Sequence, residues 1–288
     1  MKLRILITGS TGFIGRHLLE RLEENRNYEI FCLNKNPGHS KSAKFISGDI
    51  TDEESLKKIP RVDVAIHLAA LKYHYENGKE MYRVNVEGTR NLLKYVKCKQ
   101  LIFSSTVVAA DPHDDYGKSK SMCEKIIRNS RVNYTILRFS AIFGNDDDTN
   151  ITKIIKIVKK FPVVPVVGSG KQLMQPLFIN DCTKIIELCM MNKKTFRKTY
   201  FAVGQTISLN DLIRLTEQSF NLKRMKIHFP IRLLTPFIAL YEKISAKPFV
   251  TKNQLNNYDR ELIFEPTEIN KDLEFYPSPL ISSIKKSV

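Results

Sequence analysis

The sequence predicts an α/β protein whose main domain is a doubly wound parallel sheet. Apolar runs of strand length alternate with amphipathic segments of helical period through the first half of the chain. Such alternation is typical of parallel strands covered by helices on both faces. Beyond Gly144 it gives way to shorter segments. We therefore expect one domain over residues 1–144 and a smaller lobe over residues 145–288, parts of which return to the main sheet.

The first turn of the chain has the composition of a nucleotide-phosphate loop. It follows the apolar run 3–7 and precedes an amphipathic helical segment. Gly9 permits a sharp exit from the strand, Gly12 lets a pyrophosphate approach the backbone, and Gly15 lets the helix pack closely, as in a Rossmann-type dinucleotide-binding domain. Backbone N–H groups and the positive end of the helix then face the phosphates. The predicted cofactor residues of this turn are Gly9, Thr11, Gly12, Phe13, Ile14 and Gly15.

The end of the second apolar run, 28–33, is where such a domain selects its cofactor. An acidic residue there would bind ribose hydroxyls and favour NAD, but the run is followed by Asn34 and Lys35. A cation suits the 2′-phosphate of NADP. The sequence therefore weakly favours NADP over NAD. The alternative is that Lys35 is a solvated turn residue.

The remaining elements of the first half follow in order. Residues 45–50 predict a third strand, and the acidic residues after Thr51 begin a helix. Residues 62–68 predict a fourth strand. We interpret His67 within it as a packed core residue, because no second ligand stands at metal spacing. The later predictions are a helix from 85 to about 96, a fifth strand at 101–103, a helix from 116 and a sixth strand at 134–138.

The second half predicts a smaller lobe that mainly binds the substrate. We interpret the acidic run 145–148 as a solvated helix cap and predict no metal site. The apolar segment 231–244 predicts a helix that covers a substrate pocket, with a membrane-surface helix as the alternative. The other expected elements are helices at 151–158, 181–191 and 208–220, and short strands or loops at 163–170 and 175–180.

Composition narrows the class of protein. The net charge is +16 and lies mostly in the second half. It fits an anionic partner or, more simply, a solvated lysine-rich surface. No nucleic-acid motif accompanies it, so we expect no nucleic-acid partner. Five scattered cysteines and the lack of an apolar run of about 18 residues predict a cytoplasmic protein without membrane insertion.

A candidate catalytic pair stands at the start of the fifth helical segment. Tyr116 and Lys120 are four residues apart and share a helical face. Moving a phenol pKa from ~10 to ~7 takes about 4 kcal/mol, which a nearby ammonium and an oxidised nicotinamide can supply. Tyr116 would exchange a proton with a substrate hydroxyl while Ser105, at the end of the fifth strand, holds the substrate oxygen. The alternative is a helix-start aromatic residue and a surface lysine.

Together these motifs resemble the extended short-chain dehydrogenases/reductases, in their NAD(P)-dependent epimerase/dehydratase group. The resemblance covers almost the whole chain, and its later landmarks are Leu137 to Gly144, Gln175 to Cys182 and Phe264 to Tyr276. The motifs are Thr8-Gly9-x-x-Gly12-x-x-Gly15, Gly48-Asp49-Ile50, His67-Leu68-Ala69-Ala70, Asn85-Val86-x-Gly88-Thr89, Phe103-Ser104-Ser105 and Tyr116-x-x-x-Lys120.

The resemblance implies further cofactor residues. Asp49 and Ile50 would flank the adenine, and Asn85 would form the floor of the site. Tyr116 and Lys120 would also contact the cofactor, the lysine through the nicotinamide ribose. The pyrophosphate and ribose would lie against Leu68, Ala69, Ala70 and Lys72. Relatives commonly pair through two helices, which implies a homodimer.

The implied function is an NAD(P)-dependent epimerase or oxidoreductase acting on a carbinol or ketone centre of a nucleotide-activated sugar. Three departures weaken the substrate assignment: a short segment between Ser105 and Tyr116, Ala141 where many relatives have Asn, and Met174 where many have Arg. One alternative is an NADPH-dependent ketone reductase resembling dihydroflavonol reductases and hydroxysteroid dehydrogenases, which Lys35 and the apolar 229–250 stretch favour. Less favoured are a non-catalytic dinucleotide-binding protein and an RNA-binding relative.

Overall fold

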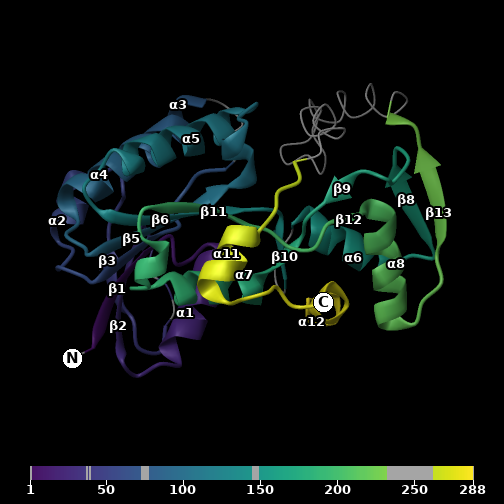
Figure 1. Ribbon diagram of the computed structural model, residues 1–288, viewed down its shortest axis with the longest axis horizontal. Helices are drawn as coiled ribbons and strands as arrows, with labels where there is room; N and C mark the ends of the chain where they lie inside the picture. The colour runs from purple at the N-terminus through teal and green to yellow at the C-terminus, as the bar shows by residue number, and fades with distance from the viewer. Residues whose placement is uncertain are drawn as a thin grey trace. The chain divides into compact units, whose positions relative to one another are not determined.

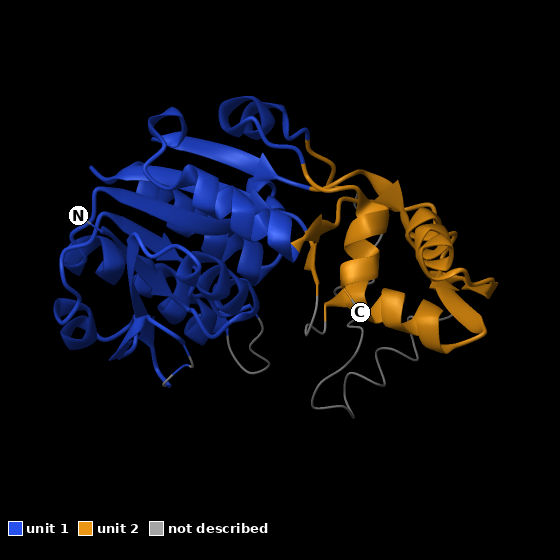
Figure 2. Cartoon of the chain, turned by 90° about the horizontal axis from the view of Figure 1, so that it is seen from below, with its two compact units in different colours: residues 1–140, 179–203, 265–276 blue, residues 141–178, 204–264, 277–288 orange. Residues whose placement is uncertain are grey.

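The computed structural model describes residues 2–36, 38, 40–72, 78–144, 149–231 and 262–287. The chain divides into two compact units (Figure 2). Unit 1 comprises residues 1–140, 179–203 and 265–276, and unit 2 comprises residues 141–178, 204–264 and 277–288. The first segment of unit 1 thus ends at Ser140, and this unit also includes two segments of the second half of the chain.

A seven-stranded parallel sheet forms the centre of unit 1, and it confirms the predicted fold class. Its strand order is β11-β6-β5-β4-β1-β2-β3, in which every neighbouring pair is parallel. The order reverses at β1, the position where open α/β sheets bind ligands at their carboxyl edge. The strands are β1 (Leu3–Thr8), β2 (Tyr28–Asn34), β3 (Lys44–Ser47), β4 (Val64–His67), β5 (Gln100–Thr106), β6 (Asn133–Phe139) and β11 (Lys198–Ala202).

Helices cover both faces of this sheet (Figure 1). One layer contains α2 (Glu53–Lys57), α3 (Gly78–Tyr82), α4 (Gly88–Tyr95) and α5 (Asp115–Arg128). The other contains α1 (Phe13–Glu23), α7 (Ile179–Cys189) and α11 (Thr267–Leu273). Ile5, Leu6 and Ile7 of β1 are completely buried, as expected of a strand covered on both faces.

Two elements of unit 1 differ from the predictions. The expected third strand ends at Ser47. The Gly48 N–H makes a last bond to the Asn34 carbonyl, and a turn closed by the Asp52 N–H on the Asp49 carbonyl then leads into α2. The helix expected from residue 85 is preceded by a π-helical turn, Arg83–Glu87, that runs into α4. Single π turns in longer helices occur frequently at functional sites.

Unit 2 contains three small two-stranded sheets and three helices within its described residues. The predicted helices near 151–158 and 208–220 are confirmed, as is that near 181–191, which belongs to unit 1 as α7. The acidic run 145–148 and the segment 232–244 lie outside the described residues. The elements are β7 (Ile142–Phe143), α6 (Asn150–Lys160), β8 (Val163–Val167), β9 (Leu173–Met174), β10 (Leu177–Phe178), β12 (Ile207–Ser208), α8 (Leu209–Phe220), β13 (Met225–Phe229) and α12 (Leu280–Lys286).

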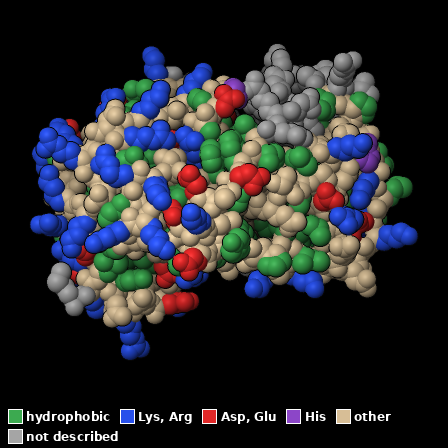
Figure 3. All heavy atoms as spheres, viewed as in Figure 1, with side chains coloured by type: hydrophobic (Ala, Val, Ile, Leu, Met, Phe, Trp, Pro, Cys, Tyr) green, Lys and Arg blue, Asp and Glu red, His purple; other side chains and the backbone are tan. Residues whose placement is uncertain are grey.

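Lys and Arg side chains are scattered over the face shown in Figure 3, with Asp and Glu side chains among them. They do not form a single basic stripe on that face. Over the part of the chain that the structure describes, no helix combines the length and apolar character needed to cross a membrane.

Candidate active site

The glycine turn brings three segments of unit 1 into close contact. Gly9 has φ +76°, and a Cβ there would lie 2.7 Å from the Ala69 nitrogen after β4. A Cβ on Gly15 would lie 2.2 Å from the Gly9 carbonyl oxygen. At Gly12 the nearest atom would be 3.4 Å away, so this side of the turn is open. Gly9 and Gly15 thus hold the three segments at close range, while the open side at Gly12 has the geometry that a phosphate cradle requires.

The end of β2 is held by polar contacts within the protein. Asn34 is 6% exposed and exchanges two hydrogen bonds with Ser10. Lys35 forms an ion pair with Asp49, with 2.8 Å between Nζ and Oδ2. Partial burial opposes ionisation of Asp49, but hydrogen bonds from Lys35 and Thr51 outweigh it and lower the pKa of the carboxyl group. The residue expected at the 2′-phosphate, Lys35, is therefore paired with one of the residues expected beside the adenine, Asp49.

His67 is fully enclosed at the end of β4, which fits its interpretation as a core residue. Burial, assisted by the charge of Lys120, lowers its pKa to about 3, so the ring is neutral. Thr89 donates its hydroxyl proton to the Asn85 carbonyl and so accepts from His67 Nε2, at 3.1 Å. Nδ1 must then accept from the Thr8 hydroxyl, at 2.8 Å. This series of hydrogen bonds connects β1 and β4 to the start of α4.

Asn85 fastens the loop after β4 to the start of α5. Its Oδ1 accepts from the Leu71 N–H at 2.7 Å, and its Nδ2 donates to the Leu71 carbonyl at 3.0 Å and to Ser119 Oγ at 2.9 Å. Ser119 in turn donates to the Tyr116 carbonyl at 2.8 Å. Asn85 thus positions the loop that carries Leu68 to Lys72 and the helix start that carries Tyr116. Nothing in the sequence pointed to Ser119 beyond its place beside Lys120.

Tyr116 and Lys120 lie on α5, whose first turn is capped by the Asp114 side chain. Tyr116 is partly exposed, whereas Lys120 is 2% exposed and its Nζ lies 4.1 Å from the centre of the Phe103 ring. Burial lowers the Lys120 pKa to about 8, and Cys123 and Glu124 oppose this shift. Among the described residues, none accepts a hydrogen bond from the Lys120 ammonium. A buried ammonium without an acceptor suits a ligand hydroxyl.

Comparison with known proteins gives the family. The family of NAD dependent epimerases/dehydratases matches residues 5–204. The chain belongs to this family. The open phosphate cradle at Gly12 and the buried Lys120 ammonium fit the dinucleotide that these enzymes use. The predicted enzyme class, an NAD(P)-dependent epimerase or oxidoreductase, is confirmed at the level of the family.

Several relatives and solved structures extend over nearly the whole chain. It is 25% identical to the N-acetyl-α-D-glucosaminyl-diphospho-ditrans,octacis-undecaprenol 4-epimerase of Escherichia coli O157:H7, over 99% of this chain and 94% of that protein. It is 26% identical to the UDP-glucose 4-epimerase of Vibrio cholerae, over 83% of this chain and 82% of that protein. The fold is similar to UDP-glucuronic acid 4-epimerase from Bacillus cereus in complex with NAD, with a TM-score of 0.77, 21% identity and coverage of 99% and 97%.

One predicted site residue of this epimerase/dehydratase-family chain lies differently from its expected role. Ser105 is 4% exposed and donates its hydroxyl proton to Glu124 Oε1, at 2.6 Å. Side chains alternate along a strand, and Ser105 shares with Phe103 the face that α5 covers. The prediction that Ser105 holds a substrate oxygen is therefore corrected, because its hydroxyl donates to Glu124 of α5.

Glu124, which sequence reasoning missed, is the centre of this buried cluster. Its side chain is 1% exposed and accepts two hydrogen bonds from Arg138, at 2.9 and 2.7 Å, and one from Arg128, at 2.7 Å. With Ser105 the carboxylate has four donors. The available signal was its spacing, since residue 124 lies one helical turn beyond Lys120 on the same face.

Thr106, at the end of β5, is the neighbouring residue whose hydroxyl could donate to a substrate oxygen. Its Oγ1 accepts from the Val108 N–H at 3.4 Å and caps the short 3₁₀ helix Val107–Ala110. That helix packs against α5, where a Cβ on Gly117 would lie 2.8 Å from Val108 Cγ1. Within the described ranges, no partner takes the Thr106 hydroxyl proton, and no group of His, Cys, Asp and Glu side chains could hold a metal ion.

Proposed function

We propose that the chain is a nicotinamide-dependent epimerase acting on a hydroxyl-bearing carbon of a nucleotide-activated sugar. The observation that carries the proposal is the Tyr116–Lys120 pair on α5, with a buried lysine that lacks a protein acceptor. It stands in the same unit as the open glycine turn. The relatives named above that act on sugars linked to a diphosphate support the choice of substrate class.

Each residue has a defined task in this reaction. Tyr116, as the phenolate, takes the proton of the substrate hydroxyl, and the phenol so formed later returns it. Lys120 binds a ribose hydroxyl of the cofactor and, being mostly protonated below its pKa of about 8, favours the phenolate. Thr106, in place of Ser105, holds the substrate oxygen through its free hydroxyl proton. The bound nicotinamide supplies a reversible hydride acceptor.

The cofactor preference is proposed to be weak and toward NADP(H). The end of β2 carries no carboxylate to repel a 2′-phosphate, and Lys35 stands there. Because Lys35 is already paired with Asp49, a phosphate must compete with that carboxylate. We therefore expect a preference of only about twofold to fivefold over NAD(H).

Unit 2 is proposed to bind the sugar nucleotide, as the sequence suggested for the second half. Ala141 begins this unit, and Met174 lies in β9, paired with Ile207 of β12. Neither offers the amide or guanidinium that many relatives have there, so this lobe should recognise its substrate through other residues. We also expect a homodimer formed through two helices, which sedimentation would detect.

Two measurements test the function. The purified protein is denatured and the released cofactor is measured at the nicotinamide absorbance band, and the native protein is assayed for interconversion of UDP-glucose and UDP-galactose. Retained cofactor with interconversion, absent in Tyr116→Phe, is the expected result. No retained cofactor, together with NADPH oxidation by an apolar ketone, would replace the epimerase by the reductase alternative.

A further inference from the structure

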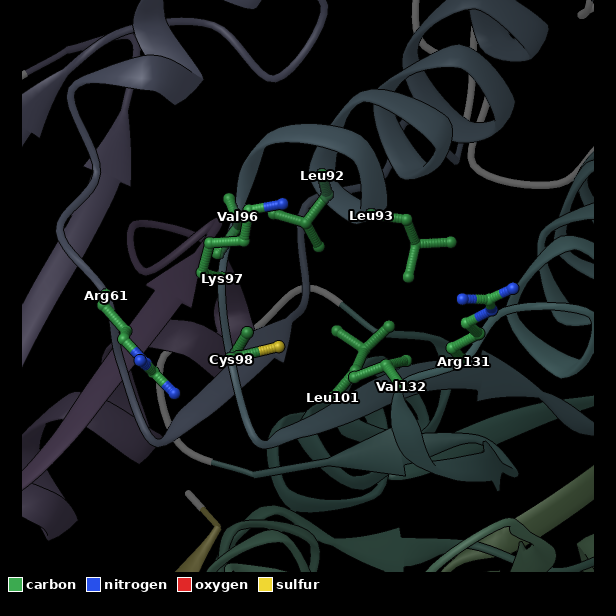
Figure 4. Close-up of a pocket in the computed structure, with 10 residues that line it drawn as sticks. Arg61, Leu92, Leu93, Val96, Lys97, Cys98, Leu101, Arg131 and Val132 are labelled. Atoms are coloured by element: carbon green, nitrogen blue, oxygen red, sulfur yellow. The ribbon is translucent and has the colours of Figure 1, made fainter.

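A cavity lies in unit 1 at the amino edge of the sheet (Figure 4). Its volume is about 470 Å³. Ala65 and Leu101, near the amino ends of β4 and β5, line it, as does Val132 just before β6. The glycine turn and Lys120 stand at the carboxyl ends of the strands. The cavity is therefore separate from the candidate active site.

The floor of the cavity is apolar. Leu92, Leu93 and Val96 reach it from the end of α4, and Leu101 and Val132 reach it from the sheet (Figure 4). Leu92, Val96 and Leu101 are buried, while Leu93 and Val132 are partly buried and belong to the edge of the main core. An aliphatic or aromatic group placed here would bury apolar surface on several sides.

Three cations stand around this floor, and no carboxylate lines it. Arg61 and Arg131 lie on opposite sides, with Lys97 between them (Figure 4). Within the described part of the chain, none of the three has an ion-pair or side-chain hydrogen-bond partner. Nearby Lys99 shows the contrast, since it is paired with Asp63 at 2.7 Å.

We propose that this cavity binds an amphiphilic anion, a single small molecule that carries a phosphate or carboxylate on an apolar group. Two guanidinium groups can each form paired hydrogen bonds with such an oxyanion. The apolar floor would accept the remainder of the molecule, and the volume lies within the usual range for small-molecule sites. Without an anion, the three like charges repel one another across the cavity, and binding would relieve that repulsion.

Titration calorimetry of the full chain with octyl phosphate tests the proposal, in saturating NADH so that the glycine turn is occupied. Inorganic phosphate and octanol serve as the two half-ligands. We expect one octyl phosphate per chain, bound at least about tenfold tighter than either half, since charge and apolar burial both contribute. Arg61→Gln and Arg131→Gln should each weaken binding by about threefold to tenfold.

Matched variants separate the site from general attraction to a basic protein. Val132→Thr keeps the side-chain shape and should weaken octyl phosphate but not inorganic phosphate. Lys125→Gln removes an exposed cation of α5 outside the cavity and should leave binding unchanged. Equal effects of Lys125→Gln and Arg61→Gln, or octyl phosphate no tighter than phosphate, would overturn the proposal. So would sedimentation showing that the cavity variants dissociate a dimer, because the cavity would then be a self-association surface.

Discussion

At the carboxyl edge of the sheet, Glu124 is nearly fully buried and accepts four hydrogen bonds. At the amino edge, the exposed Arg61, Lys97 and Arg131 surround a cavity without a carboxylate. The difference follows from solvation: a buried charge without partners costs several kcal/mol, whereas water satisfies an exposed one. A missing partner is therefore strong evidence for a ligand at buried Lys120. At the exposed cavity a missing partner is weaker evidence, so the proposed ligand there requires a binding test.

The largest effect expected is at the carboxyl edge, from Tyr116→Phe. Only the transferable proton is lost, so turnover should fall by about 10²-fold to 10⁴-fold while cofactor affinity stays nearly unchanged. Steady-state kinetics and a cofactor titration measure the two quantities. A rate within about tenfold of the parent enzyme would remove Tyr116 as the acid and base. Lys120→Met is the companion variant, and it should reduce both turnover and cofactor affinity.

The second largest effect is expected on the free energy of unfolding, when the buried cluster around Glu124 is broken. Glu124→Gln removes the charge that partners Arg138 and Arg128, and we expect a loss of about 3 kcal/mol in the free energy of unfolding. The matched control, Ser105→Ala, removes only one of the four donors and should cost about 1 kcal/mol. Urea unfolding measures both. Equal losses would mean that the hydroxyl, and not the ion pairs, accounts for the stability of the cluster.

Local sequence patterns predicted most of the fold. The glycine turn, the apolar strands and the amphipathic helices are short-range features, so they could be read from residues near one another in sequence. β11 could not be placed by this means, because its position beside β6 depends on pairing between residues 135 and 198. The π-helical turn at Arg83–Glu87 was missed for a similar reason, since the Asn85 contacts that accompany it are tertiary.

Site residues were harder to predict than elements. Ser105 was assigned from its place at a strand end, but a shift of one residue exchanges the two faces of a strand. The structure places Ser105 toward Glu124, whereas the Thr106 hydroxyl accepts from the Val108 N–H and finds no acceptor for its own proton among the described residues. The pairing of Lys35 with Asp49 joins two different loops, and nothing in either motif predicts it. Sequence reasoning thus identified the segments of the site better than the direction of each side chain.

Lowering the pH should reduce the free energy of unfolding, because burial keeps His67 neutral in the folded protein. Its pKa is about 3 in the folded protein and about 6.5 unfolded. Between these values the unfolded chain binds the proton and the folded chain does not, so stability falls as pH falls. From pH 7 to pH 5 we expect a loss of about 2 kcal/mol from this residue. Urea unfolding of the parent and of His67→Gln at both pH values measures it, and a parent as pH-dependent as the variant would contradict the assignment.

The smallest effect is expected at Lys35, which combines features of both edges because it is exposed yet already paired. Its ammonium is 2.8 Å from Asp49, so its attraction for a 2′-phosphate is partly used within the protein. Lys35→Ala should therefore reduce the preference for NADP(H) by only about twofold. Asp49→Asn provides the opposing change, because it frees the ammonium and should raise that preference, although overall affinity can fall if Asp49 contacts the adenine. Titration of both cofactors into the three proteins, at low and high salt, measures each ratio. A preference that is unchanged in both variants would show that Asn34 and its neighbours discriminate between the cofactors and that Lys35 is a solvated turn residue.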